Sequence, residues 1–87
     1  MSKRPMTLDL FATLDILDED VAAVVDAYMA DPTSGPVPIG EGYRIDPAAA
    51  VADHPFANTL IDQPWASAEH RRAAVRAAIL MAQPERT

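Results

Sequence analysis

The sequence predicts a mainly α, single-domain protein: a small bundle of four to five short helices with an irregular middle segment. Three observations support this fold class. The chain has 87 residues, a length that suits one modest domain. Residues 18–31 and 68–83 both repeat apolar side chains with the spacing of an amphipathic helix. All three glycines lie between residues 35 and 42, so we expect the irregular backbone to be concentrated there.

The domain is predicted to span residues 6–83, between a flexible N-terminal tip at residues 1–5 and a C-terminal tail at residues 84–87. Asp9 and Asp15 interrupt the apolar run that follows the basic tip, which argues against a signal peptide. No stretch approaches the roughly 20 apolar residues of a membrane span. The chain has no cysteine, which suits a reducing compartment. We therefore expect a cytoplasmic protein that does not bind a membrane.

A short helix is expected over residues 8–14, where Leu10, Phe11 and Leu14 follow helical spacing. The alternation of leucine and aspartate at the start of this stretch would also suit a short extended piece. We favour the helix, followed by a tight turn into the next element.

The clearest helix covers residues 18–31, with Asp18 predicted as its N-cap and Pro32 ending it. At about 100° per residue, its large apolar side chains fall on one side of the helix. This valine stripe consists of Leu17, Val21, Val24, Val25 and Tyr28. We expect the stripe to form one wall of the hydrophobic core.

The opposite side of the same helix carries alanines and carboxylates. Four carboxylates on or beside it are the candidate partner-binding residues: Glu19, Asp20, Asp26 and Asp31. If the valine stripe faces the core, these side chains face solvent and can meet lysines and arginines of a partner. The alternative is a solvated face that only keeps the protein soluble.

Residues 32–46 form the irregular middle segment. Two short apolar runs, Val37-Pro38-Ile39 and Tyr43-Arg44-Ile45, flank the sequence Gly40-Glu41-Gly42. This pattern indicates a small β-hairpin or an ordered loop. Proline cannot donate a backbone hydrogen bond, so the first run is not expected to be a central strand.

Two short helices are expected next, over residues 48–53 and 56–62. Asp46 followed by proline is a typical helix start, and the residue before Pro55 avoids helical backbone angles, which separates the two helices. The large side chains expected to point inward from this region are Phe56, Leu60, Ile61 and Trp65.

The last helix is predicted over residues 68–83, with Ser67 as its N-cap. One face of this helix is rich in alanine and is expected to pack against the valine stripe, because small side chains let two helices approach closely. This alanine-rich face consists of Ala74, Val75, Ala78, Ile79, Met81 and Ala82. Arg72 and Arg76 lie on the other side, where we expect them to be solvated or paired within the chain.

No catalytic or metal-binding motif is recognisable in the sequence. It has no His-Glu-x-x-His pattern, no cysteine ligand set and no Gly-x-Ser-x-Gly turn. His54 and His70 are therefore expected to be ordinary polar or helix-capping residues. We expect a non-enzymatic protein that needs neither a cofactor nor a metal.

The charge of the chain is unevenly placed. The net charge is −6, yet residues 5–62 contain eleven acidic residues and one basic residue, a net charge of −10. Such a body repels nucleic acid and anionic lipid and attracts basic surfaces. We expect a small acidic module of phage or bacterial type that binds a protein with a basic surface, as inhibitors, antitoxins, anti-CRISPR proteins and DNA mimics do. The alternative is a small structural or accessory subunit, completed by assembly into a larger complex or a homo-oligomer.

Overall fold

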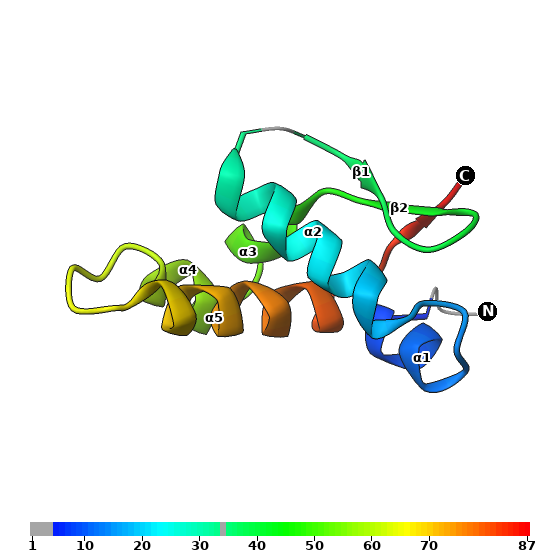
Figure 1. Cartoon of the computed structure of the whole chain (residues 1–87), viewed down its shortest axis with the longest axis horizontal. Coiled ribbons are helices and arrows are strands. Elements are labelled where there is room, and N and C mark those ends of the chain that lie inside the picture. The colour runs from blue at the N-terminus through cyan, green and yellow to red at the C-terminus, as the bar shows by residue number, and fades with distance from the viewer. Residues whose placement is uncertain (1–4, 34) are drawn as a thin grey trace.

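The computed structural model describes residues 5–33 and 35–87, and in them the predicted mainly α fold is confirmed (Figure 1). The helices are α1 (Thr7–Ala12), α2 (Asp18–Ala30), α3 (Pro47–Ala52), α4 (Pro55–Leu60) and α5 (Ala68–Met81). The strands are β1 (Val37–Pro38), β2 (Tyr43–Ile45) and β3 (Glu85–Arg86). Except for Pro5, the predicted N-terminal tip lies outside the described residues.

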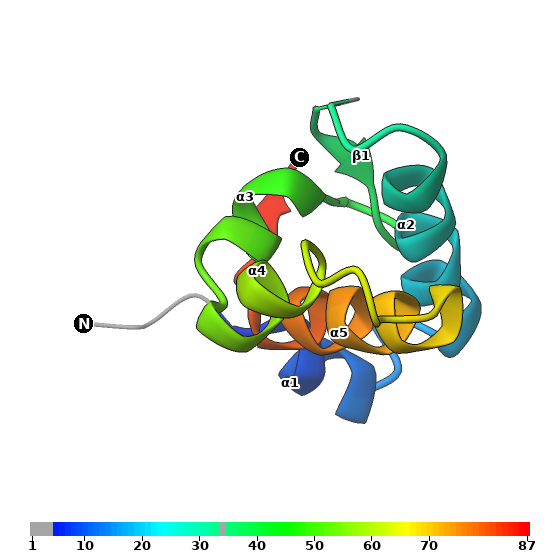
Figure 2. The same cartoon turned by 90° about the vertical axis from the view of Figure 1, so that its left-hand side faces the viewer.

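The longest helix, α5, is the element on which the other helices pack. Figure 2 shows α2, α3 and α4 on one side of α5 and α1 on the other. The valine stripe of α2 packs on the alanine-rich face of α5, as predicted: Val24 is 1% exposed and Ile79 is 0% exposed. The buried part of the stripe is shorter than predicted at its N-terminal end, because Leu17 lies at the start of α2 and remains exposed. Met81, in the last turn of α5, is also exposed.

The turn between α1 and α2 differs in detail from the prediction. α1 ends two residues early, and Leu14 adopts a φ of 64°, a left-handed conformation that non-glycine residues seldom occupy. Leu14 therefore points to solvent, whereas Ile16 just after it is fully buried. The N-cap of α2 is Leu17 and not Asp18, because the Asp20 carboxylate accepts the Leu17 N–H at 2.8 Å and supplies the cap from inside the helix.

The predicted hairpin is formed by β1 and β2, and β3 adds a third antiparallel strand in the order β1-β2-β3. Pro38 lies on the edge strand β1, where its missing N–H costs no central hydrogen bond. Residues 84–87 were predicted as a tail, but they contain β3, in which Glu85 lies opposite Arg44. This segment pairs with the free edge of β2 through backbone hydrogen bonds. So short a strand shows no periodic pattern in the sequence, which is why the sequence did not predict it.

The last three helices begin with side-chain caps, and those of α3 and α5 are the ones that the sequence predicted. The Asp46 carboxylate accepts backbone N–H groups from the first turn of α3. The His54 Nδ1 accepts the Ala57 N–H at 3.1 Å and caps α4. The Ser67 hydroxyl accepts the His70 N–H at 3.1 Å and caps α5, while the His70 ring lies 2.7 Å from the same hydroxyl. Both histidines are therefore part of helix caps.

Two side chains that were expected to point inward do not. Phe56 is 62% exposed and Trp65 is 66% exposed. α4 buries Ala57 and Leu60, which lie three positions apart on one face. Phe56 precedes Ala57 and is turned about 100° away from that face. Trp65 lies in the α4–α5 connector, and its ring packs edge-on against the His70 ring at a centroid distance of 6.1 Å, outside the core.

Candidate functional site

The four candidate partner-binding carboxylates remain on the solvent side of α2, because its opposite side packs on α5. Glu19, Asp26 and Asp31 are exposed, and Asp20 is half-buried. Between them, Ala23 and Ala30 are also exposed and add no bulk. The acidic face of α2, as we call it, consists of Asp18, Glu19, Asp20, Asp26 and Asp31.

Two arginines from α5 reach this acidic face. The Arg72 Nη2 lies 2.5 Å from the Asp26 Oδ1, and the Arg76 Nη2 lies 2.6 Å from the Asp18 Oδ1. All four side chains are more than one third exposed, so each pair contributes only about 0.2–1 kcal/mol to stability. The pairs tie the outer edges of α2 and α5 together and neutralise two of the five carboxylates, which leaves the face with a net charge of −3.

Asp20 and Asp31 have local structural roles at the two ends of α2. Asp20 supplies the N-terminal cap described above. The Asp31 Oδ1 accepts the Thr33 hydroxyl at 2.7 Å and the Thr33 N–H at 3.0 Å. These hydrogen bonds lower the pKa of Asp31, so it keeps its charge. Within the described residues, no hydrogen bond or ion pair engages the Glu19 side chain.

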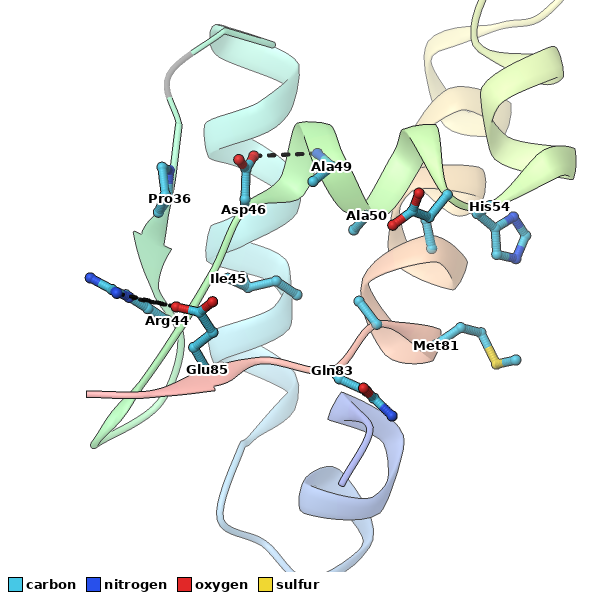
Figure 3. A pocket seen from close by; sticks show the side chains of 13 residues that line it. Pro36, Arg44, Ile45, Asp46, Ala49, Ala50, His54, Met81, Gln83 and Glu85 are labelled. Atoms are coloured by element: carbon cyan, nitrogen blue, oxygen red, sulfur yellow. Dashed lines mark hydrogen bonds and ion pairs between the residues drawn. The ribbon is translucent and has the colours of Figure 1, made fainter. Parts of the chain in front are cut away.

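A second feature is a cleft of about 580 Å³ between α3, the sheet and the end of α5 (Figure 3). The Arg44–Glu85 ion pair lies at one end of the cleft and the His54 ring lies at the other, as Figure 3 shows. Most polar groups of the cleft already have a partner: Asp46 caps α3, Glu85 pairs with Arg44, and His54 caps α4. Asp53, the residue before His54, also lines the cleft.

The third feature is a smaller groove at the α4–α5 connector. It has a volume of about 290 Å³ and is lined by Phe56, Thr59, Leu60, Gln63 and Trp65. Leu60 is buried, whereas the two aromatic rings are exposed. Sequence reasoning missed this aromatic groove because it assigned both rings to the core. The positions of Ala57 and Leu60 on one face of α4 were the signal that Phe56 must point elsewhere.

Burial raises the pKa of the Tyr28 phenol, and the carboxylate of Asp62 raises it further. Asp62 lies two residues after the end of α4, and its negative charge acts on Tyr28 of α2. Tyr28 remains a protonated, neutral part of the core.

In the part of the chain that the structure describes, no three His, Asp or Glu side chains form a group that could hold a metal ion. No helix there is both long enough and apolar enough to cross a membrane. Comparison of the chain with family models, with curated proteins and with solved structures gave no significant match.

Proposed function

We propose that this protein is a small, acidic, non-enzymatic binding module that presents the acidic face of α2 to a basic surface of a partner protein. The observation that supports the proposal is the excess of exposed carboxylates over arginines on this face, a net charge of −3 after the two ion pairs. A cytoplasmic inhibitor, an antitoxin or a mimic of nucleic acid would use such a face to occupy a groove that normally holds phosphates.

The binding would be led by charge and not by any single contact. From Glu19 to Asp31 the face extends about 18 Å at 1.5 Å per residue, and each exposed ion pair contributes only about 0.2–1 kcal/mol. A row of like charges raises the association rate by long-range attraction, and salt weakens that attraction. Ala23 and Ala30 would let a partner backbone approach the helix closely.

Arg72 and Arg76 compete with the partner in this scheme, because they already occupy Asp26 and Asp18. Binding would exchange these internal pairs for pairs with the partner's lysines or arginines. Replacing Arg72 with alanine would therefore free Asp26 and raise the association rate, with little change in folding.

The test begins with Glu19→Lys, because Glu19 holds no described contact in the fold. The matched control is Glu41→Lys, which makes the same charge change in the exposed turn of the hairpin. A partner would first be identified by affinity capture from the native host, and association rates would then be measured at low and high salt. We expect Glu19→Lys to slow association several-fold at low salt, Glu41→Lys to slow it much less, and Arg72→Ala to accelerate it. The proposal would be rejected if both lysine variants associated at equal rates and if those rates did not depend on the salt concentration.

A second candidate function is a small accessory subunit that is completed by assembly, either as a homo-oligomer or within a larger complex. The observation that favours it is the exposure of several large apolar side chains, including Leu14, Phe56 and Trp65. Assembly through apolar contacts would persist at high salt. Sedimentation of the purified protein and of any captured complex over a range of salt concentrations separates this candidate from the first.

A further inference from the structure

The cleft between α3, the sheet and the end of α5 has the size and the lining of a small-molecule site. Its volume of about 580 Å³ lies within the roughly 300–1,000 Å³ that is typical of ligand pockets. Small side chains from two helices face it, and we call them the alanine lining: Ala49 and Ala50 of α3, with Ala78 and Ala82 at the end of α5. Ligand pockets combine such an apolar lining with a few polar groups that fix the orientation of the ligand.

The polar groups of the cleft lie at its two ends. Figure 3 shows Arg44, Asp46 and Glu85 at one end and the His54 ring at the other. Asp53, which also lines the cleft, directly precedes His54. Asp46 is the N-cap of α3 and Asp53 is its C-cap, so a helix of about 10 Å separates them at 1.5 Å per residue. The cleft therefore has a carboxylate at each end and alanines between them.

These carboxylates have oxygen atoms that are not used in the fold. The Asp46 Oδ1 accepts the first-turn N–H groups of α3, and the Glu85 Oε2 accepts both hydrogen bonds from Arg44. Among the residues that the structure describes, no hydrogen bond reaches the Asp46 Oδ2, the Glu85 Oε1 or either carboxylate oxygen of Asp53. A carboxylate oxygen can accept more than one hydrogen bond. The cleft therefore offers free acceptors at both ends.

The charges of the cleft point to the same kind of ligand. The lining contains one positive side chain, Arg44, and three carboxylates, so its net charge is −2. His54 adds no charge, because its Nδ1 accepts a backbone N–H of α4 and so carries no proton. Arg44 offsets one of the two carboxylates at its own end, which leaves one net negative charge at each end. A matching ligand has two positive charges with an apolar chain between them.

We propose that this cleft binds a linear aliphatic diamine. One ammonium group binds the Asp53 carboxylate, and the other binds the free oxygens of Asp46 and Glu85. An ammonium group carries three hydrogen-bond donors, which suits several carboxylate oxygens at once. The methylene chain lies along the alanine lining and loses its contact with water. A dicarboxylate of the same length would meet its own charge at both ends and be repelled.

The probes are straight-chain diamines of increasing length, titrated into the protein by calorimetry. The affinity should pass through a maximum at the length that reaches from one end of α3 to the other, because only that chain contacts both sets of carboxylates. A monoamine of the same length should bind about tenfold more weakly, since it loses one charged, hydrogen-bonded contact. A dicarboxylate of the same length should not bind.

Two cleft variants and one control decide whether the cleft is the site. Asp53→Asn removes the carboxylate at one end and should make the diamine bind no better than the monoamine. Ala49→Leu changes no charge but fills the alanine lining at an exposed position of α3, and it should also weaken the diamine. The control, Glu19→Gln, removes one negative charge from the acidic face of α2 and should bind like the wild type. Circular dichroism checks that each variant is folded.

Several outcomes would overturn the proposal. Equal weakening by Asp53→Asn and Glu19→Gln would mean that the acidic surface as a whole attracts amines. An affinity that rises steadily with chain length, and that Ala49→Leu leaves unchanged, would mean adsorption outside the cleft. Binding that appears only after Lys3 and Arg4 are both replaced by glutamine would make the chain's own basic residues the occupant. None of these outcomes bears on the partner proposed for the acidic face, because that face takes no part in the cleft.

Discussion

α2 and α4 both pack on α5, but the aromatic residue of α2, Tyr28, is buried and that of α4, Phe56, is exposed. α2 buries its valines almost completely, with Val21 at 0% and Val24 at 1% exposure. At the other end of α5, Phe56 of α4 and the nearby Trp65 remain about two thirds exposed, at 62% and 66%. The same kind of residue is thus a core residue in one region and a surface residue in the other.

The difference follows from the lengths of the two helices. α2 has 13 residues, so its apolar stripe repeats over more than three turns and can face only one way. α4 has 6 residues, less than two turns, and its two buried side chains, Ala57 and Leu60, are enough to attach it to the core. A short helix therefore leaves the direction of its remaining side chains to tertiary packing.

The largest expected effect comes from breaking the buried side of this comparison. Val24→Asp places an unpaired charge between α2 and α5 and should unfold the domain. Such a charge costs several kcal/mol, against a total stability of about 5–15 kcal/mol for a typical domain. Ala23→Asp, one residue earlier on the exposed side, should change stability by about 0.5 kcal/mol or less. Thermal melts followed by circular dichroism measure both, and similar melting of the two variants would show that the faces of α2 are misassigned.

The next prediction compares the two regions directly by truncation to alanine. Ile79→Ala should lower the free energy of unfolding by about 2–5 kcal/mol, because it opens a cavity in the hydrophobic core. Phe56→Ala removes a larger side chain but should change stability by about 0.5 kcal/mol or less, because that side chain is already in water. Urea denaturation gives both values. A loss of several kcal/mol for Phe56→Ala would mean that the ring is buried in solution.

A smaller effect on stability is expected at the start of α5, close to the exposed Phe56 and Trp65 side chains. Ser67→Ala removes the hydroxyl that caps the His70 N–H and should cost about 0.5–2 kcal/mol. Hydrogen exchange should accelerate in the first turn of α5 and stay unchanged at the α2–α5 contact. Thr59→Ala, an exposed substitution in α4, is the control and should leave both quantities unaltered. Uniform acceleration along α5 would argue that this helix opens as one unit.

The smallest expected effect is on the pKa of Asp31, at the C-terminal end of α2. Thr33→Val keeps the Thr33 N–H but removes the hydroxyl that makes the larger contribution to lowering the Asp31 pKa, so that pKa should rise toward its ordinary value. Because the folded-state pKa is lowered, the stability from these hydrogen bonds is present above the unfolded pKa and is lost as the pH falls through the folded pKa. An NMR titration of the Asp31 carboxylate in both proteins measures the shift. An unchanged pKa would mean that the hydroxyl hydrogen bond does not form in solution.

The sequence by itself determined the features that depend on neighbouring residues. The helical spacing of α2 and α5 defined their buried faces, because residues three and four apart lie on one side of a helix. Asp46 and Ser67 marked helix starts, because a cap acts on N–H groups only two or three residues away. The two apolar runs around Gly40 indicated the hairpin for the same local reason. The outward direction of the candidate carboxylates followed from the valine stripe.

Only the tertiary structure decided which distant groups meet. Asp18 and Arg76 are 58 positions apart, and Arg44 and Glu85 are 41 positions apart, so no local sequence pattern predicts either ion pair. The same holds for the pairing of β3 with β2 and for the aromatic groove. Phe56 is exposed because Ala57 and Leu60 already fill the contact between α4 and α5. Burial depends on the space that the rest of the fold leaves open, and hydrophobicity alone does not determine it.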